Sequence, residues 1–216
     1  IVIQAEYAAM LQPFVSDDET RFYLGGVYIE PRAKSGALVI ATDGHCLGVF
    51  KDGLAVCDET AIVKLSKAMV LACKPGKDET AVRWLIVDVE GQSARIVRAP
   101  SPGEAVEVAP GHVDYLAVQG GVVVDGKYPD WRKVVPSMPG MTQPATFNAQ
   151  ILARFFKLPQ PASKSTFVRV FAGDAMGPAI VLVERDDFLG VVMPCRGVDR
   201  AELPAWGDPA PAEKAA

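Results

Sequence analysis

The sequence lacks any apolar run long enough to cross a bilayer, and it does not open with a charged and then apolar leader. It has only two histidines and four cysteines, and no two cysteines form a CxxC pair. Scattered thiols of this kind fit a reducing cytoplasm better than a disulfide framework or a zinc site. We therefore expect a cytoplasmic protein without a metal centre.

Signatures of catalysis are also missing. The sequence contains no P-loop, no nucleophile elbow and no Gly-rich dinucleotide loop. His45 beside Asp43 is the nearest approach to an acid–base pair, but Asp43-Gly44 is also a strong two-residue hairpin turn. From these residues alone, we expect His45 to be a turn residue rather than a catalytic or metal-binding one. We expect neither an enzyme nor a bound cofactor.

The charge balance excludes a protein coated with positive charge. Lysine and arginine number 22 against 26 acidic residues, which gives a net charge of −4. A locally basic surface remains compatible with this balance. Half of the 216 residues are apolar, so the chain is globular and long enough for one large or two small domains.

The order of apolar residues predicts a repeated unit. Helical spacing is found in residues 5–14, 65–72 and 151–156, and Asn148 is a suitable N-cap for the last helix. Strand patterns cover residues 21–31, 37–43, 45–51, 81–89, 93–99, 120–126, 166–172, 179–185 and 188–194, whereas residues 61–65 lead into the second helix. Residues 100–119 are rich in Pro and Gly and predict a loop with one short strand. The tail, 198–216, has the composition of a disordered segment.

These patterns predict an α+β fold made of three copies of one unit, a helix followed by about three antiparallel strands. Each helix has one apolar stripe and each set of strands has one apolar face. We therefore expect the helices on one face of a continuous sheet.

Four segments resemble the bacterial DNA polymerase III beta subunit, the sliding clamp. They are DETRFYLGGVYIE, ATDGHCLGVF, VDGKYPDWRKVVP and VVMPCR, and they occur in the same order as in that family. The resemblance implies a DNA-clamp fold in a shortened form. Residues 1–136 would be a complete domain similar to the clamp's second domain, and residues 137–197 would be half of a domain, similar to the end of the third.

In this family a groove between the second and third domains accepts short peptides of polymerase, clamp-loader or repair proteins. By matched motif, the resemblance implies that the groove here contains Leu24, Thr42, Gly44, His45, Leu47, Pro129, Lys133, Val134, Val191, Val192, Met193, Pro194 and Arg196. Apolar side chains would form the pockets, and His45, Lys133 and Arg196 would contact the polar ends of the peptide. Cys46 and Cys195 replace the residues usual in the family, Arg and Met, which changes the charge and depth of the groove.

The resemblance also implies double-stranded DNA as a partner, bound without sequence specificity by the helices of a ring. The candidate DNA-facing residues are Arg21, Lys64, Lys67, Lys74, Lys77, Arg154 and Lys157, whereas the first helix has no basic residue. For Arg21 a surface salt bridge is the alternative, and for Arg132 we favour a solvated strand end.

The resemblance also implies self-association, because a ring in this family contains twelve half-domains. With three half-domains per chain, four chains would be required, and the unpaired half-domain would pair with its copy in a neighbour. A monomer capped by its own tail is the alternative. The sequence thus predicts a processivity factor that binds peptides and encircles DNA, or else a clamp-like adaptor or decoy that binds peptides without encircling DNA.

Overall fold

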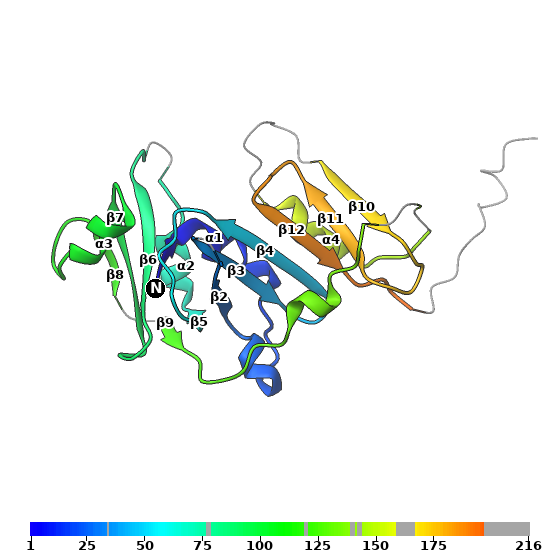
Figure 1. Ribbon diagram of the computed structural model, residues 1–216, viewed down its shortest axis with the longest axis horizontal. Coiled ribbons are helices and arrows are strands. Elements are labelled where there is room, and N and C mark those ends of the chain that lie inside the picture. The colour runs from blue at the N-terminus through cyan, green and yellow to red at the C-terminus, as the bar shows by residue number, and fades with distance from the viewer. Residues whose placement is uncertain are drawn as a thin grey trace, which may run out of the picture.

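The structure is a computed structural model of the chain. It describes residues 1–33, 35–76, 79–118, 121–138, 141, 144–158 and 167–196. The molecule is elongated, with the first strand at one side of the centre and the last strands toward one end (Figure 1). The predicted disordered tail and Lys77 lie outside the described residues.

Most of the strands form one eight-stranded antiparallel sheet. In spatial order these are β10 (Val168–Ala172), β11 (Ala179–Val183), β12 (Phe188–Val192), β4 (Cys46–Asp52), β3 (Ala37–Thr42), β2 (Val27–Pro31), β5 (Ala61–Leu65) and β9 (Gly121–Val123). The pairing of β12 with β4 places Val191 directly opposite Leu47. The last described strand, β12, is thereby joined to the hairpin near residue 44.

A second, four-stranded sheet contains β1 (Val2–Gln4), β6 (Val82–Asp88), β7 (Ser93–Ala99) and β8 (Tyr115–Val118). One of its faces packs into the main core and the other is covered by α3 (Pro102–Glu107). On the α3 side, Trp84 is fully buried and its indole Nε1 donates a hydrogen bond of 2.9 Å to the carbonyl of Ala99.

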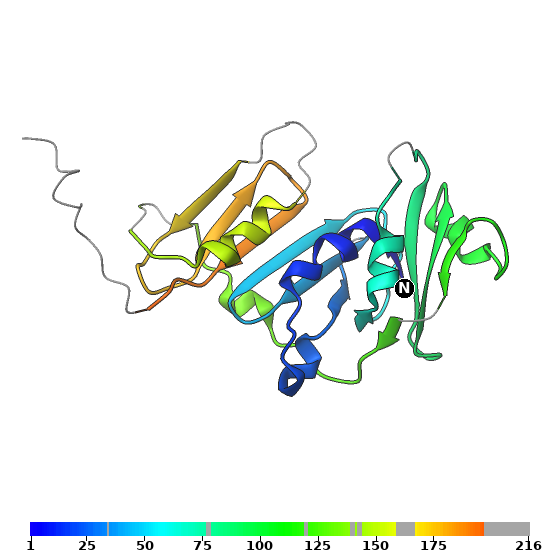
Figure 2. The same ribbon diagram turned by 180° about the vertical axis from the view of Figure 1, so that it is seen from behind.

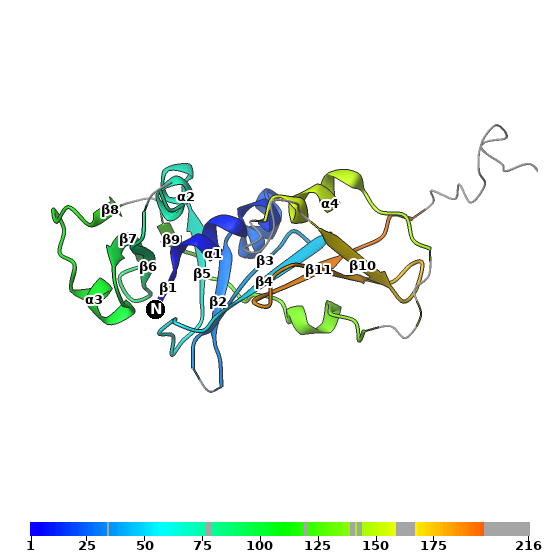
Figure 3. The ribbon, with the colours of Figure 1, turned by 90° about the horizontal axis from the view of Figure 1, so that it is seen from above.

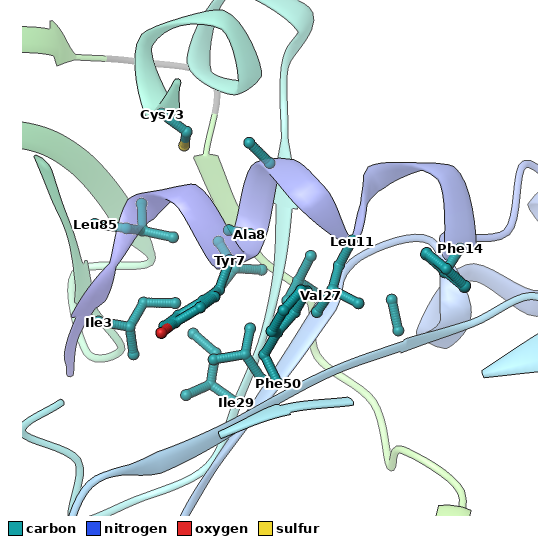
Figure 4. Packing of buried hydrophobic residues seen from close by; sticks show 14 of the residues in the cluster. Ile3, Tyr7, Ala8, Leu11, Phe14, Val27, Ile29, Phe50, Cys73 and Leu85 are labelled. Carbon is teal, nitrogen blue, oxygen red and sulfur yellow. The ribbon is translucent and has the colours of Figure 1, made fainter. Parts of the chain in front are cut away.

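The helices α1 (Ala5–Met10), α2 (Lys67–Cys73) and α4 (Ala149–Phe156) lie on one side of the eight-stranded sheet, as Figures 2 and 3 show. A short helix, η1 (Gln12–Phe14), follows α1. Tyr7 and Leu11 point from α1 toward Val27, Ile29 and Phe50 on the strands (Figure 4). The rings of Tyr7 and Phe50 stack at 4.9 Å between centroids.

The predicted α+β fold, with its helices on one face of a sheet, is confirmed, with differences in detail. The strands form two sheets rather than one continuous sheet, because α1 and α2 pack between the inner faces of both. The predicted strand over residues 21–31 begins only at β2. Before it, η2 (Glu19–Leu24) forms because the Asp18 side chain accepts a hydrogen bond of 2.9 Å from the backbone N–H of Thr20.

The segment 100–119 contains a helix that the sequence interpretation missed. Ser101 is the N-cap of α3, its hydroxyl accepts from the N–H of Glu104 at 3.3 Å, and Pro102 occupies the first helical turn. Serine followed three residues later by glutamate, with proline between, is a capping signature. The helix was therefore readable from the sequence.

Two glycines allow the last unit to pack against the first. Gly48 and Gly190 are opposite one another on β4 and β12, beneath Phe14 and Phe155. The rings of Phe14 and Phe155 meet edge to face at 5.0 Å between centroids. A Cβ on Gly190 would lie 2.5 Å from Cε1 of Phe155 and 3.0 Å from the carbonyl oxygen of Val181.

We expect Gly190→Ala to lower the free energy of unfolding by about 1–3 kcal/mol, because the added methyl group displaces a buried ring. Chemical denaturation measures this loss. Gly53→Ala is the matched control, since nothing lies within 4 Å of a Cβ there, and it should change stability by less than about 0.5 kcal/mol. Equal effects of the two substitutions would refute the close packing of β12 beneath α4.

Candidate functional site

An apolar pocket of about 150 Å³ lies where four segments distant in the sequence meet. The segments are η2, the turn between β3 and β4, the short helix η3 (Trp131–Val134) with the residues before it, and the end of β12. Its lining residues are Leu24, Thr42, Gly44, His45, Cys46, Leu47, Pro129, Asp130, Trp131, Val134, Val191 and Met193.

The pocket belongs to the face of the sheet opposite the helices. Successive side chains of a strand point to opposite faces, so Leu47 and Val191 share a cluster with Leu24 and Trp131, while Val192 joins the core beneath α4. Figure 3 shows η3, the green helical turn, on the opposite side of the sheet from α1 and α4.

The floor of the pocket follows from strand register. Leu47 and Val191 are paired across β4 and β12, and both are buried. Beyond β12 the backbone N–H of Met193 donates a hydrogen bond of 2.9 Å to the carbonyl of His45. This bond places the partly exposed Met193 side chain at the edge of the pocket, and Pro194 then ends the strand because it has no N–H.

The turn between β3 and β4 is held by the buried carboxylate of Asp43. It accepts hydrogen bonds from the backbone N–H groups of His45 at 2.8 Å and Cys46 at 3.0 Å. The hydroxyl of Thr42 donates to the carbonyl of Cys46 at 2.7 Å, and Gly44 adopts φ +90°. A left-handed conformation favours glycine, so the sequence T-D-G-H specifies this turn closely.

Arg154 connects this turn to α4. Its Nη1 donates to Asp43 Oδ2 and to Cys46 Sγ, the latter at 3.1 Å. Burial by itself raises the pKa of Asp43, but the Arg154 hydrogen bond and the two backbone N–H donors outweigh it and lower that pKa below its usual value. Burial raises the pKa of the Cys46 thiol to about 12, so the thiol is neutral. With its oxygens engaged, the Asp43 carboxylate holds the turn and is not placed as a catalytic base.

The opposite wall is built on η3. Trp131 is buried, and the guanidinium of Arg132 lies 4.3 Å from the centre of its ring while also forming an ion pair with Glu30. Nearby, the rings of Tyr28 and Tyr128 stack at 4.5 Å. Arg132 is solvated as predicted, since its side chain is 57% exposed, but it lies in η3 rather than at a strand end and it contacts both Glu30 and Trp131.

Most of the residues predicted for the groove are brought together in the pocket: Leu24, Thr42, Gly44, His45, Leu47, Pro129, Val134, Val191 and Met193. Leu24 comes from η2 rather than from a strand. Val192 does not line the pocket, because strand alternation turns it toward the core. Lys133 lies beside the pocket, 80% exposed, with Nζ 3.6 Å from Asp130 Oδ2. Pro194 and Arg196 follow β12 without lining the pocket.

Three lining residues were absent from the predicted groove set: Cys46, Asp130 and Trp131. Cys46 and Asp130 are direct neighbours of predicted residues in the sequence, and Trp131 lies two positions from both Pro129 and Lys133. The motifs therefore contain the segments that surround this pocket, and turn geometry decides which neighbouring residues also face it.

The predicted DNA-facing residues fall into two groups. Lys64, Lys67, Lys74 and Lys157 are exposed. Arg154 does not fit the prediction because it is bound to Asp43, and Arg21 donates to the Asp18 carboxylate and, at 2.9 Å, to the carbonyl of Asp43. The salt-bridge alternative for Arg21 is therefore the better description.

Within the described ranges, no three His, Cys, Asp or Glu side chains are grouped so that they could hold a metal ion. In the same part of the chain, no helix has the length and apolar character needed to span a membrane.

A scan against protein-family models and a search of curated proteins gave no match to the sequence. The fold, in contrast, is similar to solved bacterial sliding clamps. The DNA polymerase III subunit beta from Pseudomonas aeruginosa has a TM-score of 0.58 at 15% identity, with 91% of this chain and 65% of that chain covered. For Caulobacter crescentus pol III beta the TM-score is 0.56 at 17% identity, with the same coverage.

The DNA polymerase sliding clamp from Bacillus subtilis gives a TM-score of 0.55 at 15% identity, covering 91% of this chain and 64% of that one. The chain thus has the DNA-clamp fold and spans a little under two thirds of the length of these clamps.

Proposed function

We propose that this chain is a sliding-clamp-like protein whose pocket receives the apolar anchor of a short peptide from a polymerase, clamp-loader or repair protein. The observation that supports this most strongly is the meeting of η2, the 43–46 turn, η3 and the end of β12 around one apolar pocket. The proposed action is attachment of a partner, in which the protein makes and breaks no covalent bond.

The pocket has the size and chemistry for such a peptide. Its volume of about 150 Å³ is below that of a typical cofactor site and suits one or two apolar side chains. Leu47, Val191 and Met193 supply apolar contacts, and methionine adapts to anchors of different shape. Lys133 is 80% exposed and, among the described residues, pairs only with Asp130 at 3.6 Å, so it is available to an acidic group of the peptide.

We further propose the domain organisation implied by the resemblance. Residues 1–136 form one complete clamp-type domain and residues 137–197 form half of a second. The pocket then lies between the complete domain and the half-domain. The pairing of β4 with β12 supports this placement.

The test is a titration of a fluorescently labelled clamp-binding peptide with the full chain, followed by anisotropy. We expect a dissociation constant in the micromolar range, which corresponds to a binding free energy of about −8 kcal/mol. A control peptide with its apolar anchors replaced by aspartate should not bind. Absence of binding up to about 1 mM, or equal binding of both peptides, would reject the proposal.

Encirclement of DNA is a second candidate, supported by the exposed lysines 64, 67, 74 and 157. A ring would stay on nicked circular DNA and slide off the same DNA once it is linearised, whereas an adaptor or decoy would show no difference. Direct contacts to phosphates would also weaken as salt rises. Retention on circles alone supports the ring, and equal behaviour on both DNAs supports the adaptor.

A further inference from the structure

The first two helix-and-strand units complete one another's sheets. Unit one (residues 2–52) runs β1, α1, β2, β3, β4, and unit two (residues 61–118) runs β5, α2, β6, β7 and β8. The strand before each helix leaves its own unit and pairs with the first strand after the other helix. Thus β1 pairs with β6, Val2 opposite Ile86, and β5 pairs with β2, Val63 opposite Val27.

The strand before each helix has a second, local partner. On its other side it pairs with the segment that follows the last strand of its own unit. Val2 and Val56 exchange two backbone hydrogen bonds of 2.8 and 2.9 Å, and Val63 of β5 pairs with Val123 of β9. Both units therefore have the same strand-pairing pattern, in which the strand before the helix makes one pairing within its own unit and one with the other unit.

Unit three (residues 144–192) repeats the pairing within its own unit. Residues 144–147 precede α4, and the carbonyl of Thr146 accepts a hydrogen bond of 2.7 Å from the N–H of Cys195, which follows β12. Ala145 and Phe147 are partly buried against the core, while their neighbours Pro144 and Thr146 are exposed. This alternation is that of a strand.

Among the described residues of unit three, no strand makes the exchanged pairing. β10 is the first strand after α4, the position of β2 and β6, and within the described residues the sheet ends at β10 (Figure 1). α4 is also poorly covered. One of its eight residues is buried, against four of six in α1, and Phe156 is 51% exposed.

We propose that a second copy of this chain completes unit three by exchanging strands about a two-fold axis. Residues 144–147 of each copy pair with the β10 edge of the other, and the two α4 helices pack together as α1 packs on α2. A second copy fits because unit three both lacks a strand and offers one, which makes the surface self-complementary. Pairing would also cover an open strand edge and the exposed face of α4. This inference is independent of the peptide pocket.

Sedimentation equilibrium of the full chain between about 1 and 100 µM tests the inference. We expect a mass of at least twice the 23.1 kDa of one chain. Phe156→Glu should weaken this association at least tenfold, because it places a charge between the two α4 helices. Leu71→Glu is the matched control, because Leu71 is 70% exposed on α2, which belongs to the two units that already complete each other's sheets. Its replacement should leave the mass unchanged.

Hydrogen exchange gives a second readout. The amides of β10 should be protected in the wild type and exchange faster in Phe156→Glu, with the thermal unfolding of that variant showing that it is folded. A wild-type monomer across the whole range, or an association weakened by Leu71→Glu and not by Phe156→Glu, would overturn the inference. So would a monomer that dimerises only after removal of residues 197–216, since the chain's own tail would then occupy the edge.

Discussion

Met193→Glu should lower the affinity for a clamp-binding peptide by about 100-fold or more. The substitution removes an apolar side chain from the edge of the pocket and places a carboxylate where an apolar anchor would be buried. Losing the apolar contact costs about 1.5–3 kcal/mol, and burying a charge without a partner adds to that cost. Every 1.4 kcal/mol corresponds to a factor of ten in the dissociation constant, which calorimetry or anisotropy would measure.

Met176→Glu is the matched control, because Met176 is exposed and does not line the pocket. It should bind the peptide as the wild type does. Since Met193 is only partly buried, the folded state should tolerate glutamate there, and thermal unfolding would show this. Unchanged affinity in a folded Met193→Glu protein would remove the pocket from the account of peptide binding.

Asp43→Ala should destabilise the protein by about 2–4 kcal/mol, because three donors lose their acceptor at once. These donors are the backbone N–H groups of His45 and Cys46 and the guanidinium of Arg154. Arg154 is partly exposed, so water compensates some of the loss. Asp43→Asn keeps an acceptor for the turn and removes the charge, and it should cost less. Denaturant unfolding of the three proteins checks this order, and a loss below about 0.5 kcal/mol for the alanine variant would contradict it.

The same carboxylate predicts a dependence of stability on pH. Although burial opposes it, the Arg154 contact and the backbone donors lower the pKa of Asp43 in the folded state below its unfolded value of about 3.9. The stabilisation is therefore fully present above that value and is lost as the pH falls through the lowered folded pKa. Asp43→Asn should lose less stability than the wild type between pH 5 and the acid limit. Parallel pH profiles for the two proteins would show that Asp43 contributes none of this dependence.

The segments of the site were predictable because short-range chemistry defines them. Asp43-Gly44 is a turn for local reasons, Pro194 ends a strand for local reasons, and the alternation in β3, β4 and β12 survives in the fold. The resemblance to sliding clamps then indicated which of these segments meet. The pocket residues contributed by the turn, by η3 and by the end of β12 followed from that step.

Other features depend on contacts that no local pattern contains. The ion pair of Arg154 with Asp43 joins residues 111 positions apart, so a helix arginine that looked free for DNA is used within the fold. Strand alternation placed Val192 on the core face, although the sequence around it is apolar on both sides. The exchange of β1 and β5 between units is likewise a property of topology. It cannot be derived from the composition of either strand.

The central claim is that η2, the 43–46 turn, η3 and the end of β12 form one site for a partner peptide. A crystal structure of the full chain with a clamp-binding peptide tests it most directly. We predict an apolar anchor of the peptide enclosed by Leu47, Trp131 and Met193. A peptide bound elsewhere, with this pocket left empty, would contradict the account.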